Sequence, residues 1–136
     1  MRVILSIKPE YAEKILNGSK RFEFRKTGFG VDGVTSVLIY ATRPIGKVVG
    51  EFEIEKVYVD SPSSIWDKTK RFAGIAKSFF DEYYKNRDVA VAIAVGKVQR
   101  YDAPVDLQAF GADLTAPQSF RYLRGDTPTP QLQLPL

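Results

Sequence analysis

The segment Asp88–Val98 constrains the fold most, because its side chains alternate in size along the whole stretch. Successive side chains of an extended strand point to opposite faces. One face therefore carries branched residues and the other carries small ones: Val89, Val91, Ile93 and Val95 against Ala90, Ala92, Ala94 and Gly96. The small face allows a helix to approach closely. The segment predicts a sheet that packs against helices, as in an α+β fold.

Other segments predict further strands of this sheet. Arg2–Ile7 and Val34–Ala41 are apolar on both faces, which is typical of inner strands. Lys47–Val59 predicts a long strand, whose apolar positions change parity between Ile54 and Val57. Such a change indicates a bulge or bend. Long bent strands are typical of small barrels.

Three segments predict helices. Pro9–Leu16 begins with a first-turn proline and is followed by Asn-Gly, which favours a left-handed stop at Gly18. Ser61 and Pro62 are a capping residue and a first-turn proline, and they predict the start of a second helix. The segment Ala76–Lys85 predicts a third helix with an aromatic stripe, which we interpret as core: Phe79, Phe80, Tyr83 and Tyr84. We also expect a helical turn at 106–110 and an extended segment at 117–123.

The length of 136 residues favours one domain, which we place at residues 1–123. Residues 124–136 form a tail rich in Pro, Gln and Leu, in which Leu132, Leu134 and Leu136 alternate. We expect this tail to lie extended against its own domain or a neighbour's, which offers a route to an oligomer.

No apolar run reaches the roughly 18 to 20 residues of a membrane span. The first residues read as a strand rather than a signal peptide, so we expect a cytoplasmic protein without a membrane partner.

The chain has no cysteine and no histidine. Disulfides, thiolate and imidazole metal sites, cysteine nucleophiles and a histidine base are therefore excluded. Any chemistry must use carboxylates, Lys, Arg, Tyr, Ser or Thr. The sequence predicts no cofactor.

The net charge of +4 is unevenly distributed. Residues 1–47 carry nine Lys and Arg against four Asp and Glu, a net +5, and the remaining residues come to −1. A local positive field of this kind favours partners that carry phosphate.

The stretch GSKRFEFR, Gly18 to Arg25, concentrates charge in the basic third of the chain. One interpretation is a binding site in which Lys20 meets a phosphate or a carbonyl and Glu23 stays ionised beside two cations. The other is an ordinary amphipathic strand over about Arg21–Lys26, with solvated charges on one face. By strand parity Lys20 falls on the side of Phe22, so a functional Lys20 must sit in the turn before the strand.

Gly18, Lys20, Glu23 and Arg25 reproduce the pattern G-x-K-x-x-E-x-R, which resembles the signature of the ASCH domain, a PUA-like family. The resemblance extends over about residues 2–123. It implies a curled barrel of five or six mostly antiparallel strands with flanking helices beside a cleft. It also implies that Lys20, Glu23 and Arg25 line this cleft, that Gly18 shapes its loop, and that RNA or a nucleotide binds there.

Four more residues extend the predicted binding site. Tyr40, Thr42 and Arg43 follow an inner strand where the chain reaches the barrel rim, and Arg121 could add a phosphate contact. Tyr40, Thr42 and Arg43 have an alternative interpretation, in which the tyrosine packs at the barrel end and the other two belong to a turn with an exposed arginine.

A different function class is an enzyme in the same cleft, acting on RNA or a modified nucleoside, with Lys20 as base or electrostatic stabiliser and Glu23 as its partner. Relatives that hydrolyse acetylated cytidine resemble this chain at Lys20, but Glu23 replaces their nucleophilic Thr and their distant Glu has no match.

Glu51, Glu53 and Glu55 resemble a metal cluster, yet alternate strand positions lie ~7 Å apart and usually form a solvated face. We predict no metal site. A third possibility is an interaction module that docks through the tail.

Overall fold

The computed structural model describes residues 1–30, 32–111, 113–117 and 120–123. The predicted tail at 124–136 lies outside the described residues. In chain order the elements are β1 (Arg2–Ile7), α1 (Pro9–Leu16), β2 (Phe22–Arg25), β3 (Ser36–Ala41), β4 (Lys47–Asp60), α2 (Pro62–Thr69), the 3-10 helix η1 (Lys70–Phe72), α3 (Lys77–Tyr83), β5 (Ala90–Val105), the 3-10 helix η2 (Leu107–Phe110) and β6 (Phe120–Leu123).

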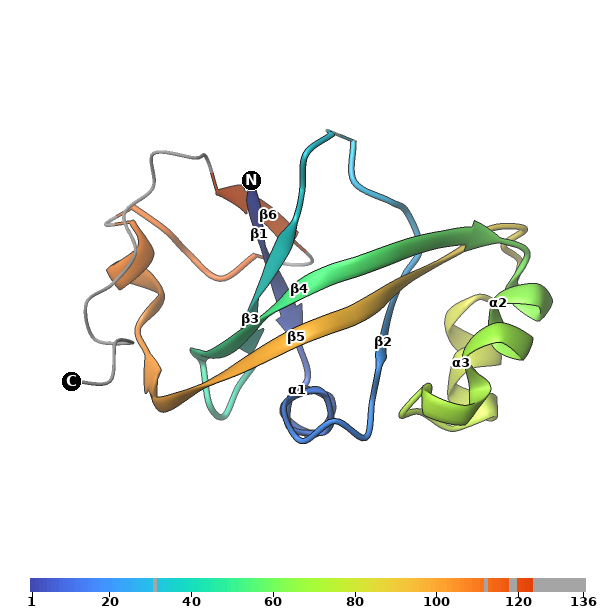
Figure 1. Ribbon diagram of the computed structural model, residues 1–136, viewed down its shortest axis with the longest axis horizontal. Helices are drawn as coiled ribbons and strands as arrows, with labels where there is room; N and C mark the ends of the chain where they lie inside the picture. The colour runs from blue at the N-terminus through green and yellow to red at the C-terminus, as the bar shows by residue number, and fades with distance from the viewer. Residues whose placement is uncertain (31, 112, 118–119, 124–136) are drawn as a thin grey trace.

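The described strands form one sheet in the order β2-β5-β4-β3-β1-β6. β1 and β3 run parallel, and the other described pairs run antiparallel. The two strands predicted to be inner, β1 and β3, each have a neighbour on both sides. The sheet is curled, with β4 and β5 crossing the middle of the molecule and α2 and α3 at one end (Figure 1). This confirms the predicted α+β fold, a mostly antiparallel curled half-barrel with flanking helices.

The curl of the sheet depends on bends in its long strands. The pairing of β4 with β5 shifts register between Phe52 and Ile54 and again between Ile54 and Lys56. These shifts lie where the parity change predicted a bulge, and bulges increase the local twist of a strand. The bent pair brings β2, at one edge of the sheet, close to the end of β1.

Apolar side chains fill both sides of the curled sheet. One cluster lies under α1 and contains Leu5, Ile15, Val37 and Phe52 among others. Another packs α2 and α3 against the small face of β5, where Ile65, Phe80 and Tyr84 meet Ala90 and Ala92. The predicted close approach of a helix to the alanine face is therefore confirmed.

The aromatic stripe of α3 is only partly core. Phe80 and Tyr84 are buried, as predicted, and Tyr83 is half-buried. Phe79 was also expected in the core, but its side chain is 42% exposed. Successive residues of a helix point about 100° apart, so α3 buries Phe80 and turns Phe79 outward.

None of the described helices combines the length and apolar character that a bilayer crossing requires.

Candidate functional site

The loop between α1 and β2 turns Lys20 inward. Gly18 follows the helix with φ of +88°, a left-handed conformation that glycine adopts without strain. The backbone N–H of Lys20 donates to the Lys14 carbonyl at 3.0 Å, and that of Arg21 donates to the Phe72 carbonyl at 2.9 Å. Lys20 therefore sits in the turn before β2, as a functional Lys20 required.

The ammonium group of Lys20 lies in a mostly aromatic environment. Its side chain is 1% exposed, and Nζ donates to the carbonyl oxygen of Ala73 at 2.5 Å. Nζ also lies 4.8 Å from the ring centroid of Phe24 and 5.5 Å from that of Tyr11. Burial lowers the pKa of Lys20 to about 8, while Glu23 opposes this shift and Lys14 adds to it. The amine can thus exchange a proton near neutral pH.

Glu23 and Arg25 form an ion pair on β2. The Arg25 Nη2 atom lies 2.8 Å from Oε2 of Glu23 and also donates to the Ser6 carbonyl of β1 at 3.1 Å. The Glu23 side chain is only 10% exposed and the Arg25 side chain only 11%. The interpretation of this strand face as solvated is therefore wrong for Glu23 and Arg25, because the curled sheet brings the end of β1 over them. It holds for Arg21, which is exposed.

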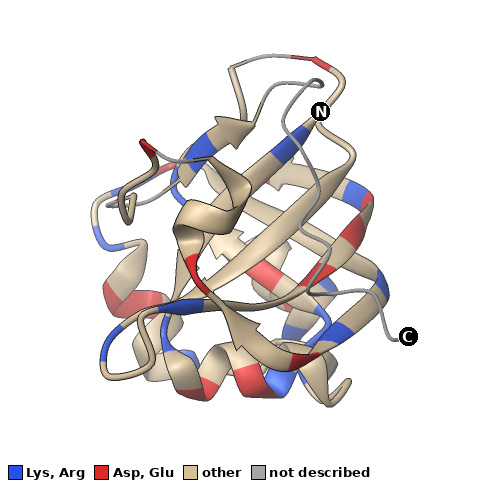
Figure 2. Cartoon of the chain, turned by 90° about the vertical axis from the view of Figure 1, so that its left-hand side faces the viewer, with Lys and Arg blue, Asp and Glu red and all other residues tan. Residues whose placement is uncertain are grey.

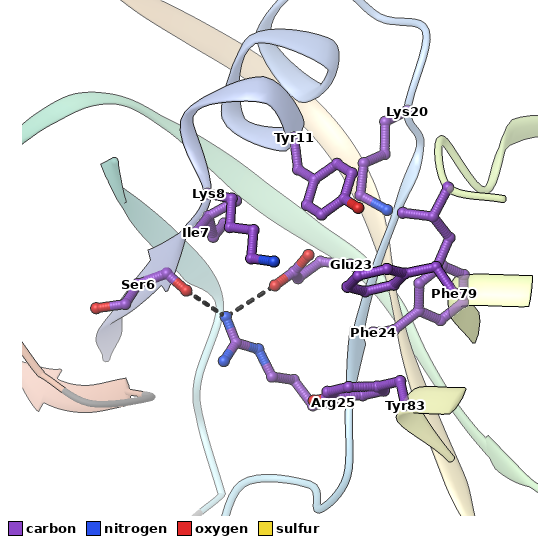
Figure 3. A pocket seen from close by; sticks show the side chains of 11 residues that line it. Ser6, Ile7, Lys8, Tyr11, Lys20, Glu23, Phe24, Arg25, Phe79 and Tyr83 are labelled. Carbon is purple, nitrogen blue, oxygen red and sulfur yellow. Dashed lines mark hydrogen bonds and ion pairs between the residues drawn. The ribbon is translucent and has the colours of Figure 1, made fainter. Parts of the chain in front are cut away.

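Lys20, Glu23 and Arg25 converge on one pocket of about 300 Å³, whose wall comes from β1, α1, β2 and α3 (Figure 3). Its lining residues are Ser6, Ile7, Lys8, Tyr11, Lys20, Glu23, Phe24, Arg25, Ile75, Phe79 and Tyr83. The volume lies at the lower end of the range for small-molecule sites. Three signature residues predicted from the sequence thus share one concavity.

Two rings that line this pocket each have a cation close to their face. Lys8 Nζ lies 5.0 Å from the ring centroid of Phe79, and Lys26 Nζ lies 4.8 Å from that of Tyr83. The lining itself holds three cations and one carboxylate. Elsewhere the charges are mixed: the view in Figure 2 shows basic and acidic positions interspersed over the strands and helices.

Four predicted binding residues do not line this pocket. Tyr40 packs against the core cluster around Leu38 and Val48, and Arg43 is exposed in the turn after β3. Thr42 comes nearer, since its N–H donates to the Ile7 carbonyl at 3.0 Å. Arg121 is exposed on β6. A role for these four in binding stays a prediction.

Several lining residues were not predicted. Tyr11 lies within the predicted helix Pro9–Leu16, and Phe79 and Tyr83 belong to the stripe interpreted as core. The i, i+4 spacing of Phe79 and Tyr83 was a usable signal, because it places both on one side of α3. Lys8, Ser6 and Ile75 come from loops and a strand end, and no sequence pattern marks them.

The glutamates of β4 do not assemble a metal site in the described part of the chain. Glu53 and Glu55 are exposed, and Glu51 accepts a hydrogen bond from the Tyr101 hydroxyl at 3.2 Å. Among the described residues, no group of three or more acidic side chains has the geometry to hold a metal ion.

Comparison with known proteins decides the family. The model of the ASCH domain matches residues 5–99, which include the whole signature and the pocket it lines. The chain belongs to the ASCH domain family. The predicted domain at residues 1–123 contains the matched segment, and the boundary itself stays a prediction.

Two relatives from Ureaplasma parvum serovar 3 carry a similar segment within longer proteins. One is named large ribosomal subunit protein uL22 and is 35% identical over 123 residues, which is 90% of this chain and 39% of that protein. The other is named ATP synthase subunit alpha and is 32% identical over 90% of this chain and 15% of that protein. The chain spans less than half of the length of either relative.

A relative of similar size comes from Zymomonas mobilis. It is named ASCH domain-containing ribonuclease and is 27% identical, covering 89% of this chain and 83% of the relative. A crystal structure of the ASCH protein from Zymomonas mobilis superposes with a TM-score of 0.82 at 26% identity, over 91% of this chain and 88% of that one. The N-terminal domain of Staphylothermus marinus McrB, at 14% identity and a TM-score of 0.59, shares the fold alone. The PUA-like architecture of this ASCH domain is thereby supported by solved structures.

Proposed function

We propose that this ASCH domain binds single-stranded RNA and takes one unpaired nucleotide into the pocket of Lys20, Glu23 and Arg25. The observation that carries the proposal is the convergence of an ammonium, a carboxylate–guanidinium pair and several aromatic rings on one hollow of about 300 Å³. Proteins recognise unpaired bases with this combination, in which rings stack on the base and polar groups pair with its edge.

Each side chain has a role that follows from its chemistry. Glu23 can only accept, so it pairs with an exocyclic amine of the base, and Arg25 donates to a base oxygen or ring nitrogen. Phe79 offers an exposed ring for stacking at the mouth of the pocket. Lys8, which lies beside that ring, is placed to meet the phosphate of the same nucleotide.

Charge supports the same ligand. Three cations against one carboxylate make the lining net positive when all four are ionised. A positive concavity attracts the phosphate backbone, and each contact releases a counterion from it. We therefore propose a basic cleft, and we keep the cytoplasmic location as part of this proposal.

Fluorescence anisotropy with a labelled unstructured RNA tests the binding function. We expect affinity to fall as salt rises, and Lys8→Ala to reduce the slope of log affinity against log salt by about 0.7, the value for one lost contact to a single strand. Lys97→Ala is the matched control, because Lys97 is exposed on β5 and does not line the pocket. Equal slopes for both variants would count against the proposal.

A second candidate is cleavage of the bound RNA. The specific observation is the pKa of about 8 for Lys20, which makes its neutral amine available to accept a proton. In such a reaction the ribose 2′-oxygen attacks the adjacent phosphorus and its proton passes to Lys20. The bond from phosphorus to the 5′-oxygen of the next nucleotide breaks, that oxygen takes a proton from water, and a 2′,3′-cyclic phosphate remains. The name of the Zymomonas mobilis relative supports this reaction class. Loss of cleavage in both Lys20→Met and Glu23→Gln, measured at RNA concentrations that saturate each variant, would establish it.

A further inference from the structure

A second hollow, of about 230 Å³, is lined in part by residues that are neighbours in the chain of those lining the first. It is bounded by the start of β2, η1 and the paired strands β4 and β5, and its lining residues are Arg21, Phe22, Glu55, Tyr58, Phe72, Ala94 and Val95. Three of them are aromatic. Phe72 is 46% exposed, and the rings of Phe22 and Tyr58 lie 6.5 Å apart between centroids.

Cations surround these rings. The Arg21 guanidinium carbon lies 5.7 Å from the centroid of Phe72, and the ammonium groups of Lys56 and Lys68 lie 5.0 and 5.6 Å from that of Tyr58. The acidic neighbours are Glu55 in the lining and Asp60, whose carboxylate lies 3.6 Å from Lys68 Nζ. Exposed rings beside cations are the components with which proteins hold single-stranded nucleic acid.

The linings of the two hollows meet along the chain at Lys20 and Arg21. Lys20 lines the first hollow and Arg21, the next residue, lines the second. Across from them, the Ala73 carbonyl accepts from Lys20 Nζ, and the Phe72 carbonyl accepts from the Arg21 N–H at 2.9 Å. Successive residues of an extended segment point to opposite sides, so Lys20 and Arg21 present their side chains to different hollows.

We infer that the second hollow binds a further nucleotide of the same RNA strand, with its base stacked on Phe72 and its phosphate on Arg21. This inference rests on the proposed function, and it specifies the ligand class. The ligand is an RNA oligomer that passes over the segment of Lys20 and Arg21, and a mononucleotide fills only the first hollow. The succession of Lys20 and Arg21 in the two linings and the excess of cations over carboxylates around the rings favour RNA over a protein partner.

The test compares two ligands across the same set of variants. Anisotropy is measured for a labelled mononucleotide and for an unstructured RNA of about 8 nucleotides, within the range that small binding domains cover. The variants are Arg21→Ala, Phe72→Ala and Lys20→Met, with Arg71→Ala as the charge-matched control, because Arg71 is exposed on η1 beside Phe72 and does not line the hollow. Thermal melting checks that each variant is folded.

We expect Phe72→Ala to weaken binding of the oligomer at least about fivefold, as the loss of one stacked base does, and to leave mononucleotide binding unchanged. Arg21→Ala should lower the salt slope for the oligomer by about 0.7, and Arg71→Ala should change neither ligand. Lys20→Met should weaken binding of both ligands.

Unchanged oligomer affinity in Arg21→Ala and Phe72→Ala, with a loss of affinity in Lys20→Met, would overturn the inference that the second hollow binds a nucleotide and leave the proposed function intact. If the unmodified chain binds neither ligand, the proposed function fails and this inference fails with it.

Discussion

The ammonium of Lys20 and the carbonyl oxygen of Ala73 lie 2.5 Å apart, although 53 positions separate the two residues in the chain. The contact joins the loop after α1 to the segment between η1 and α3. It also fixes the amine at the floor of the pocket, where burial keeps its pKa near 8. The catalytic and binding proposals both depend on this position of Lys20.

Gly74→Ala should disturb Lys20. Gly74 has φ of +71°, and a Cβ there would meet Cβ and Cγ of Lys20 at 2.5 Å. Gly33 has φ of +84°, and no described atom lies within 4 Å of the Cβ that alanine would add, so Gly33→Ala carries the backbone strain without the clash. We expect about 1–2 kcal/mol of destabilisation for Gly33→Ala in urea unfolding and a larger loss for Gly74→Ala. Weaker RNA binding is expected for Gly74→Ala alone, and equal effects of the two variants would refute the role of the close approach.

Adjacent aromatic residues of α3 should separate binding from stability. Phe80 is buried, so Phe80→Ala should cost about 3–5 kcal/mol of unfolding free energy. Phe79 is exposed at the pocket mouth, so Phe79→Ala should leave the melting temperature nearly unchanged and weaken RNA binding at least about fivefold. A Phe79→Ala variant with full RNA affinity would show that this ring does not stack on the base.

The Glu23–Arg25 pair should matter far more to stability than an exposed pair of similar geometry. Arg25→Ala leaves the Glu23 carboxylate poorly hydrated, and we expect a loss of roughly 3 kcal/mol. Arg100 makes two hydrogen bonds to Glu13 at the surface, and Arg100→Ala should cost less than about 1 kcal/mol. Urea unfolding of both variants measures the difference. We also expect the Glu23→Gln/Arg25→Met double variant to regain part of the unfolding free energy that Arg25→Ala loses. Similar losses for Arg25→Ala and Arg100→Ala would contradict the greater weight of the buried pair.

The titration of Lys20 should give binding and cleavage opposite pH dependences. The pKa of Lys20 falls from 10.5 in the unfolded chain to about 8 in the folded one, so the charge is lost as pH rises through 8. RNA affinity should therefore decrease over this range, whereas a cleavage rate that needs the neutral amine should increase. The Lys20→Met variant should show neither change.

Stability provides an independent check on the same group. Between pH 8 and 10.5 the unfolded chain holds more protons on Lys20 than the folded chain, so folding stability from this group rises with pH. The rise is up to about 3 kcal/mol. Urea unfolding at pH 8 and at pH 10.5 measures it: the unfolding free energy of the unmodified chain should rise more between the two pH values than that of Lys20→Met. Parallel pH profiles of the two proteins would mean that Lys20 is not buried in this way.

Much of the fold could be predicted from the sequence because its local patterns agree with the sheet. The alanine face of β5, the proline at the start of α1 and the parity change in β4 each have a direct structural counterpart. The Ser61 cap was also predictable, and its hydroxyl accepts from the Ser64 N–H at 3.3 Å. Each of these features involves residues close together in the chain, so it can be recognised in a single sequence.

The site was less predictable, because it depends on contacts between distant segments. Strand parity alone assigned Glu23 and Arg25 to a solvated face, but the curled sheet places the end of β1 against them. Phe79 was assigned to the core, since helical spacing does not distinguish a buried ring from one at a pocket mouth. The residues alone left Lys20 open between a binding site and an ordinary strand, and only the family resemblance favoured the site. Nothing local indicated that Ala73 would accept its hydrogen bond.

The most direct test of the central claim is a crystal structure of the protein with a short single-stranded RNA. We expect one unpaired base in the pocket, with hydrogen bonds to Glu23 and Arg25 and with Phe79 against its face. RNA bound only elsewhere on the surface, with the pocket closed to it, would show that this pocket is not the binding site.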